Sequence, residues 1–365
     1  MQGQEAAASL LPTLLPGTRI LIIRLRSIGD IVLLTPALRL LKTWRPELRL
    51  SVIVEPGFRA LLEGNQDVDE ILEPGIGLGW ARTGAGSRAL REIRARHFAL
   101  CLNLHGGPTS SLLTWLSGAR WKAGFAHFRR RRIYQILIPD ARTILSQPTI
   151  HTAEHQASAF FYLGLPRREI PAARLEVAAA HAAWWNEKRL SLGLAPRGEY
   201  AVLHPTALYA TKQWAPENFA RLGTWLESET GLPVLYSCGP GEASTLDAVE
   251  HAAGRAIRRL AGPGLGQFAA ALAAARLFVG NDSGPAHMAA ALGRPGVVIF
   301  GSSSSRIWGP WLPGAPWRVV QNPYDCNPCP GDRCYRFERP ECILSVKFEQ
   351  VRAAVGAVLA ESVPP

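Results

Sequence analysis

Short apolar runs rich in Ile, Leu and Val alternate with amphipathic helical patterns along this chain, and this alternation limits its fold more than any other feature. Residues 19–25 (RILIIRL) have the pattern of a buried strand. Residues 31–44 follow with apolar side chains spaced as on one helix face, and Pro36 either kinks this helix or marks its start. Strands and helices that alternate in this way form parallel sheets with helices on both faces.

The alternation weakens over about residues 139–171 and then restarts, so that two halves join near residues 170–195. A chain of 365 residues is too long for one core of ordinary size. We therefore predict two doubly wound α/β domains, over residues 1–175 and 176–344. A last helix lies in residues 345–365, which we expect to pack back on the first domain. The other predicted strands cover residues 50–55, 69–73, 99–104 and 120–125 in the first half and 200–203, 232–237, 277–280 and 297–301 in the second.

The net charge of +11, from 40 Lys and Arg against 29 Asp and Glu, favours polyanionic ligands such as phosphates, nucleic acid or an anionic membrane. Only five of these cations are lysines, so a genome-wide bias toward Arg is an alternative explanation. Residues 97–119 form the longest stretch without Asp, Glu, Lys or Arg, but Asn103 and Pro108 within it rule out a spanning helix. The N-terminus lacks the basic region of a signal peptide. We expect a soluble, cytoplasmic protein.

The first candidate site follows the first strand, where residues 26–30 (RSIGD) form a short polar loop. Ligands of parallel sheets bind at the carboxyl ends of the strands. Asp30 lies at a helix start and has two interpretations. It caps free backbone N–H groups, or it is a general base that faces a ligand.

The second half carries two further polar loops at strand ends. In residues 280–287 (GNDSGPAH), Ser283 and Gly284 allow a phosphate to approach the N–H groups of a helix start. The alternative is a helix capped by Ser283 with His287 on its surface. Lys212 lies in the loop after another strand, where it reaches a phosphate or remains a solvated surface lysine.

The glycine clusters do not predict a nicotinamide or flavin cofactor. Residues 262–266 lack the G-x-G-x-x-G spacing, and residues 75–79 have no acidic partner at the expected distance. The sequence also has no G-x-x-x-x-G-K-[ST] loop.

Four cysteines near the C-terminus have the spacing C-x2-C-x4-C-x7-C. Thiolates this close in sequence are typical of a metal site, most simply structural zinc, and an iron–sulfur cluster is a second option. A reduced or disulfide-paired loop without metal is the alternative. The four residues are Cys326, Cys329, Cys334 and Cys342.

Together these motifs resemble the ADP-heptose:lipopolysaccharide heptosyltransferase family, glycosyltransferase family 9. The resemblance runs from about residue 19 to residue 355, and the cysteine cluster recurs in many members. Its most specific block is 280–287 with the following Ala-Ala and Gly-x-Pro. The other matching blocks are residues 27–30, 35–38, 102–106, 118–120, 124–125 and 204–205, together with Lys212, Trp214 and Phe219.

The resemblance implies a GT-B fold, in which two Rossmann-like domains face each other across a cleft. The acceptor binds the N-terminal half and the nucleotide-sugar donor the C-terminal half, with inversion and without a catalytic cofactor. It implies that Asp30 deprotonates the acceptor hydroxyl. The donor residues that it implies are Lys212, Ser283 and Gly284 for the diphosphate, Asp282 and His287 for the shape of the loop, and Glu242 for the ribose.

Two departures from the family pattern lie near the donor. Thr206 stands where the family usually has Gly, and residues 301–305 (GSSSS) replace a Gly-Pro-Thr type of turn. Four consecutive arginines lie in the acceptor half. Because Arg forks suit phosphate and carboxylate groups, we predict that they bind an anionic lipid A core, with a solvated loop as the alternative. They are Arg129, Arg130, Arg131 and Arg132.

The resemblance therefore implies an inverting enzyme that transfers heptose from ADP-heptose to a lipopolysaccharide inner-core acceptor, and we expect it to be peripheral at the inner face of the inner membrane. One alternative is a transferase of the same fold with another nucleotide sugar or acceptor. Others are a non-catalytic nucleotide-sugar or polyanion binder and a redox protein centred on the cysteines. Nucleic acid is not an expected partner, because no aromatic–basic stacking motif of single-strand binders occurs.

Overall fold

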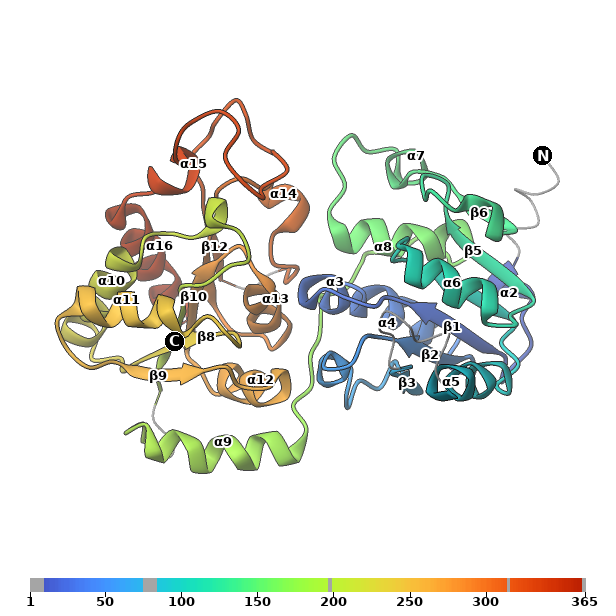
Figure 1. Cartoon of the computed structure of the whole chain (residues 1–365), viewed down its shortest axis with the longest axis horizontal. Helices are drawn as coiled ribbons and strands as arrows, with labels where there is room; N and C mark the ends of the chain where they lie inside the picture. Colours follow the sequence, from blue (N-terminus) through green and yellow to red (C-terminus); the bar gives the residue numbers. More distant parts are fainter. Residues whose placement is uncertain (1–9, 75–83, 196–198, 314–315, 363–365) are drawn as a thin grey trace. The chain divides into compact units, whose positions relative to one another are not determined.

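The computed structural model describes residues 10–74, 84–195, 199–313 and 316–362. The chain forms two compact units that divide between Glu176 and Val177 (Figure 1), one residue from the predicted boundary. The glycine cluster at residues 75–79 lies outside the described residues.

The first unit is built on a parallel sheet that has six strands within the described residues, in the order β3-β2-β1-β4-β5-β6. The chain first moves outward from β1 to β3 and then returns to the other side of β1. The strands are β1 (Arg19–Ile23), β2 (Arg49–Ile53), β3 (Glu70–Leu72), β4 (Leu100–Asn103), β5 (Trp121–Phe125) and β6 (Ile136–Ile138).

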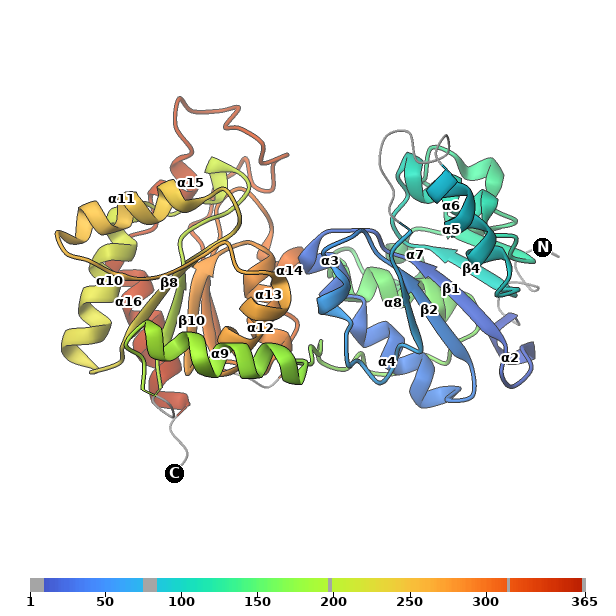
Figure 2. The same ribbon diagram turned by 60° about the horizontal axis from the view of Figure 1, so that its bottom comes forward.

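Helices cover both faces of this sheet. Figure 2 shows α5 and α6 on one face, where Ile93 and Leu113 pack against Leu21 and Ile23 of β1, and α4 and α8 on the other. The helices are α2 (Leu10–Thr13), α3 (Ile28–Val32), α4 (Thr35–Trp44), α5 (Gly84–Arg94), α6 (Pro108–Leu116), α7 (Ala141–Leu145) and α8 (Thr152–Tyr162), with short 3-10 turns η1 (Arg59–Leu61) and η3 (Arg131–Ile133).

The helix predicted over residues 31–44 is two helices, α3 and α4. Pro36 lies in the first turn of α4, where a proline without an N–H is tolerated because that N–H has no partner within the helix. The short α3 therefore stands alone directly after β1, and it carries Asp30.

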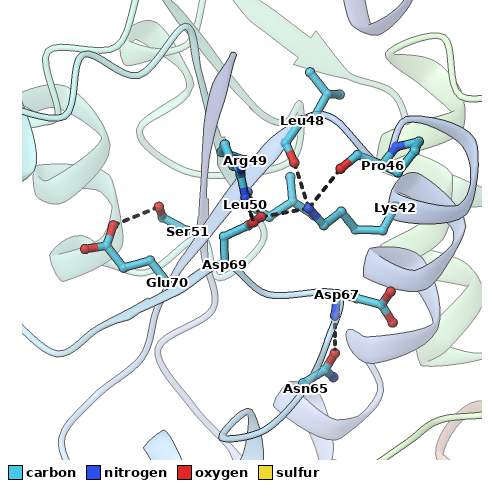
Figure 3. A network of polar contacts seen from close by, with 10 residues as sticks. All are labelled: Lys42, Pro46, Leu48, Arg49, Leu50, Ser51, Asn65, Asp67, Asp69 and Glu70. Carbon is cyan, nitrogen blue, oxygen red and sulfur yellow. Dashed lines mark hydrogen bonds and ion pairs between the residues drawn. The ribbon is translucent and has the colours of Figure 1, made fainter. Parts of the chain in front are cut away.

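A network of charged residues links α4, β2 and β3 at the amino edge of this sheet, where its strands begin (Figure 3). Asp69, just before β3, accepts hydrogen bonds from Lys42 of α4 and Arg49 of β2, both at 2.8 Å, and from the backbone N–H of Leu50. Burial opposes the charge, but these hydrogen bonds lower the pKa of Asp69 below its ordinary value. Its polar groups are thus engaged in holding helix and strands together.

The second unit repeats the same topology, with strand order β12-β11-β10-β7-β8-β9 within the described residues. All pairings given for this sheet are parallel. The strands are β7 (Ala201–His204), β8 (Val234–Cys238), β9 (Arg258–Ala261), β10 (Leu277–Asn281), β11 (Gly296–Ile299) and β12 (Trp317–Val320).

Two helical layers enclose this second sheet, with α9, α12 and α13 in one layer and α10, α11 and α16 in the other. The helices are α9 (Ala179–Ser191), α10 (Pro216–Glu229), α11 (Ala243–Ala253), α12 (Leu265–Ala273), α13 (Gly284–Ala291), α14 (Ser305–Trp308), α15 (Glu341–Leu344) and α16 (Phe348–Glu361), with the 3-10 turn η4 (Ala210–Lys212). Among the described residues, no helix is both long and apolar enough to span a membrane.

The C-terminal helix α16 belongs to the second unit, which differs from the expectation that residues 345–365 pack on the first domain. It lies beside α10 (Figures 1 and 2) and contacts β11 and β12. Its side chains Val351, Val355 and Val358 are fully buried in the core of that unit. Their spacing places them on one helix face, and the sheet of the second unit covers that face.

Candidate functional site

Each sheet has a topological switch point, where strand order reverses and a crevice opens at the carboxyl ends of the strands. In the first unit this point lies between β1 and β4, and in the second between β7 and β10. Asp30 follows β1, Lys212 follows β7 and Asp282 follows β10. The fold therefore brings three of the predicted site residues to the carboxyl edges at which α/β sheets bind ligands.

The carboxylate of Asp30 is held from the start of its own helix. Oδ2 of Asp30 accepts the backbone N–H of Ser27 at 3.2 Å and its hydroxyl at 3.1 Å. The amide of Gln156, on α8, donates to the backbone carbonyl of Asp30 at 2.9 Å. Asp30 thus lies at the third helical position and completes a capping box instead of acting as the cap itself. The other oxygen of the Asp30 carboxylate, Oδ1, has a different partner.

That second oxygen, Oδ1 of Asp30, forms an ion pair with Arg24, a residue that the sequence analysis did not single out. Arg24 also donates to the carbonyl of Leu104 after β4. Both charged side chains are mostly buried, with 13% exposed for Arg24 and 16% for Asp30. Oδ2 already accepts two hydrogen bonds, but Oδ1 has a further lone pair, so Asp30 can still accept a proton from a hydroxyl group.

Two histidines near this carboxylate, His155 and His105, are held neutral. Burial, the neighbouring His127 and the positive Arg24 together lower the pKa of His155 to about 4. Burial followed by Arg24 and Arg26 lowers the pKa of His105. The ring of His155 stacks on Phe125 at a centroid distance of 4.2 Å. The two neutral rings therefore add no charge beside Asp30, and Arg24 is the cation paired with it.

The four consecutive arginines lie between β5 and β6 and are all exposed. Arg130 donates to the carbonyl of Pro108, at the start of α6, at 3.5 Å. No salt bridge pairs these arginines with a carboxylate in the part of the chain that the structure describes. They remain available for an external anion, and their role in acceptor binding stays a prediction.

In the second unit, Lys212 and Asp282 form an ion pair, with Nζ 2.7 Å from Oδ2. The hydroxyl of Ser303 also donates to this carboxylate oxygen. Asp282 is 6% exposed, whereas the side chain of Lys212 is 22% exposed. Asp282 therefore lies on the buried side of the lysine, whose side chain keeps partial contact with solvent.

The predicted anion site is the start of α13, directly after β10. Ser283 stands at the N-cap of α13, but its hydroxyl donates to the carbonyl of Asn281 at 3.2 Å and does not cap the helix. Gly284 opens the helix, and Pro285 follows. His287 is only 5% exposed, so the alternative that it lies on the helix surface is wrong.

A chain of buried polar groups orients Glu242, at the start of α11. The hydroxyl of Thr206 donates to Oε2 of Glu242 at 2.7 Å, and the N–H of Gly239 donates to the same oxygen at 2.8 Å. Thr206 is also 2.9 Å from Nε2 of His204, whose Nδ1 is 3.0 Å from the hydroxyl of Ser237. Burial lowers the pKa of His204 to about 4, so it is neutral. Within the described residues, no side-chain hydrogen bond engages Oε1 of Glu242.

This arrangement of two switch-point sites agrees with the comparison of the sequence with known families. Residues 87–336 match the profile of glycosyltransferase family 9 (heptosyltransferase). The chain belongs to this family. It is therefore a glycosyltransferase, and the predicted enzyme class is confirmed.

Individual relatives of this glycosyltransferase are distant but match over most of their length. Lipopolysaccharide heptosyltransferase 3 of Escherichia coli K12 is 25% identical over 303 residues, which cover 78% of this chain and 82% of the relative. The structure of E. coli ADP-heptose lipopolysaccharide heptosyltransferase II has a TM-score of 0.74 at 20% identity, covering 94% of this chain and 99% of that one. The likeness in structure confirms the predicted GT-B fold.

The four predicted metal-ligand cysteines of this glycosyltransferase line one small cavity, together with Thr211 and Ser302. Burial and, after it, the nearby Cys329 raise the pKa of Cys342 to about 11. Four thiols are a donor set that zinc and iron accept. Among residues 10–74, 84–195, 199–313 and 316–362, however, no three His, Cys, Asp or Glu side chains are placed to hold an ion. An ion would have to draw the thiols together.

A more distant structural relative is an iron-containing enzyme. The iron-containing dodecameric glycosyltransferase TibC from enterotoxigenic E. coli H10407 has a TM-score of 0.57 at 16% identity, covering 96% of this chain and 78% of that one. At this identity the likeness shows the fold alone.

Proposed function

We propose that this glycosyltransferase moves heptose from ADP-heptose to an inner-core lipopolysaccharide acceptor, with inversion at the sugar carbon. The observation that carries the proposal is the pair of switch-point sites, one with a carboxylate and the other with a lysine beside a helix start. The names of the relatives, lipopolysaccharide heptosyltransferase 3 and ADP-heptose lipopolysaccharide heptosyltransferase II, support the choice of sugar and acceptor.

The donor half of the proposal concerns the leaving group. Transfer of the sugar leaves a diphosphate whose charge must be stabilised. The ammonium of Lys212 and the N–H groups at the start of α13, beside Ser283 and Gly284, do this without a metal ion. Glu242 offers Oε1 to a ribose hydroxyl, because Thr206 and Gly239 occupy Oε2.

The acceptor half of the proposal concerns the attacking hydroxyl. Asp30 removes its proton as the bond to the sugar forms. Arg24 keeps the carboxylate oriented, and Arg129 to Arg132 contact anionic groups of the core or lipid A. Because such an acceptor is anchored by lipid, we also propose that the enzyme works at the cytoplasmic face of the inner membrane.

The direct test measures ADP release from ADP-heptose with a core acceptor. Asp30→Asn is expected to lower kcat by roughly 10²- to 10⁴-fold, while ADP still binds. Asp67→Asn is the matched control, because Asp67 is a carboxylate of the same unit at the opposite edge of the sheet. A wild-type enzyme that releases no ADP above background contradicts the proposal.

The donor nucleotide is tested separately by thermal stability. A ligand that binds only the native state raises its melting temperature, so a panel of ADP-, UDP-, GDP- and CMP-sugars should show the largest rise with ADP-heptose. A larger rise with another nucleotide sugar would assign a different donor to the same fold. Binding that survives Asp30→Asn without any turnover in the wild type would favour a non-catalytic binder.

We further propose that Cys326, Cys329, Cys334 and Cys342 hold a structural metal ion, zinc or iron. The shared cavity and the four-thiol donor set support this, as does the presence of iron in TibC. Metal analysis of the purified protein is expected to find about one ion per chain if all four thiolates share one site. Cys329→Ser should remove it, and Cys238→Ala, which changes a buried cysteine outside the cavity, should not.

A further inference from the structure

Thr211 joins the loop that carries Lys212 to the loop that carries Cys326, Cys329 and Cys334. It lies in η4, directly before Lys212, and is only 2% exposed. Its hydroxyl donates to the carbonyl of Gly331, in the cysteine loop (residues 326–334). The same hydroxyl accepts a hydrogen bond from Ser302 at 3.0 Å. Residues 120 positions apart in sequence are thus connected through one buried hydroxyl group.

Backbone hydrogen bonds reinforce this junction. The N–H of Ser302 donates to the carbonyl of Thr211 at 3.3 Å, and the N–H of Cys329 donates to the carbonyl of Ser302 at 3.0 Å. The side-chain amide of Asn327 donates to the carbonyl of Gly301 at 2.8 Å. The donor-lysine loop, the turn after β11 and the cysteine loop are therefore tied into one layer.

The junction is also closely packed. A Cβ atom at Gly301 would lie 2.2 Å from the carbonyl oxygen of Thr211, which no side chain can tolerate. Gly331 has a φ of +88°, and a Cβ atom there would lie 3.1 Å from the hydroxyl of Ser302 and 3.9 Å from Cε of Lys212. Movement of the cysteine loop therefore has little room to occur without a shift of Thr211 or Lys212.

Thr211 and Ser302 also form part of the wall of the cavity that the four cysteines line. A change in the thiols, such as metal binding, thus acts on the same small space as the hydroxyl of Thr211. On the other side, the ammonium of Lys212 is fixed by Asp282 at 2.7 Å. Lys212 therefore has two restraints, Asp282 on its side chain and Thr211 on its backbone.

We propose that Thr211 is a positioning residue that transmits the arrangement of the cysteine loop to Lys212, so that the state of the four thiols sets the affinity for the donor diphosphate. The inference rests on the proposed function, in which Lys212 binds that diphosphate. Thr211 itself is buried and acts through Lys212.

The experiment uses the full chain and ADP as the probe, with Kd measured by calorimetry and kcat and KM measured with ADP-heptose. Thr211→Val keeps the size and shape of the side chain but removes both hydrogen bonds of its hydroxyl group. We expect this loss to weaken the Kd for ADP by about tenfold. The KM for the donor should rise in step while kcat at saturation changes less. Thr211→Ser, which keeps the hydroxyl, should restore ADP binding.

Two controls separate this role from a general loss of stability. Thr224→Val removes a hydroxyl that donates only to the carbonyl of Ala220 in α10, at 3.1 Å, and should leave the Kd unchanged. Ser302→Ala removes the other hydroxyl of the junction and should weaken ADP binding as well. It therefore tests the coupling even if Thr211→Val folds poorly.

The link to the thiols is tested by a double-mutant cycle with Cys329→Ser. This change should weaken ADP binding in the wild type but add little in the Thr211→Val background, because coupled residues are not additive. Full additivity, or wild-type ADP affinity in Thr211→Val, overturns the inference and leaves the proposed function intact. A wild-type protein that binds no ADP contradicts the proposed donor and this inference with it.

Discussion

Nζ of Lys212 lies 2.7 Å from Oδ2 of Asp282, a carboxylate that is only 6% exposed. The positive charge of the lysine is thus balanced in the structure by a buried partner. An incoming diphosphate has to share the ammonium group with Asp282. Under the proposed function the pair therefore has two roles, one in stability and one in donor binding, and the two can be separated by mutation.

Lys212→Met should lose both roles. It leaves Asp282 buried without its cation, which costs about 1–3 kcal/mol of stability, and it removes the charge that binds ADP. The double variant Lys212→Met with Asp282→Asn should regain most of the stability but none of the ADP affinity. Denaturant unfolding and calorimetry with ADP check the two effects. Recovery of ADP binding in the double variant would show that Lys212 does not contact the diphosphate.

Thr206 stands where the family resemblance leads us to expect a glycine, and in the structure its hydroxyl has a defined partner. It donates to Oε2 of Glu242 at 2.7 Å. Thr206→Val should leave Glu242 less well oriented and weaken ADP binding by roughly tenfold, as expected for one lost buried hydrogen bond. Calorimetry with ADP measures this, and Ser228→Ala, an exposed change on α10, is the control. An unchanged Kd in Thr206→Val would remove Glu242 from the proposed ribose site.

Acid should destabilise the first unit through His155. Its pKa is about 4 in the folded protein and ordinarily 6.5. Between these values the unfolded chain binds a proton that the folded protein does not, so stability falls as pH drops from about 6.5 to about 4, by at most about 3 kcal/mol. His155→Phe keeps the ring on Phe125 and removes the titration.

The free energy of unfolding, measured from pH 7 to pH 4, should therefore fall less steeply in His155→Phe. His204 has a similarly lowered pKa, so part of the slope should remain. His251→Gln changes an exposed histidine of α11 and should match the wild type. Equal slopes in His155→Phe and the wild type would contradict the assignment of His155 as a buried neutral group.

The positions of Asp30, Lys212 and Asp282 could be predicted because each follows an apolar run that reads as a strand, and strand ends locate ligand sites in this kind of fold. The strands β6, β9 and β12 could not, because they are short and partly exposed. β9, for example, begins with Arg258 and Arg259. Local pattern alone cannot identify such edge strands.

Contacts between residues that are distant in sequence could not be predicted either. Arg24 looks like the end of a strand, and only the fold brings it to Asp30. The partner of Thr211 is Gly331, 120 residues further along. The apolar face of α16 is visible in the sequence, but the sheet that covers it is decided by packing. Residue type and spacing therefore predict the groups that carry chemistry better than the groups that orient them.

The ion pair between Arg24 and Asp30 makes the last prediction. Arg24→Gln removes the cation that holds Oδ1 of Asp30, so the carboxylate can turn away from the acceptor hydroxyl. A misplacement of about 1 Å in a reacting group lowers rates by up to about 10²-fold, and we expect kcat to fall by roughly 10- to 100-fold. ADP affinity should be unchanged, because the donor residues lie in the second unit.

The measurement pairs steady-state kinetics with ADP calorimetry on Arg24→Gln, Arg24→Lys and Arg49→Gln. Arg24→Lys keeps a cation near Asp30 and should recover part of kcat. Arg49→Gln removes an arginine that is 64% exposed and pairs with Asp69 at the amino edge of the same sheet, so it should retain wild-type kcat. A wild-type kcat in Arg24→Gln would show that Ser27 alone orients Asp30. A loss of ADP affinity in that variant would instead point to a general disturbance of the fold.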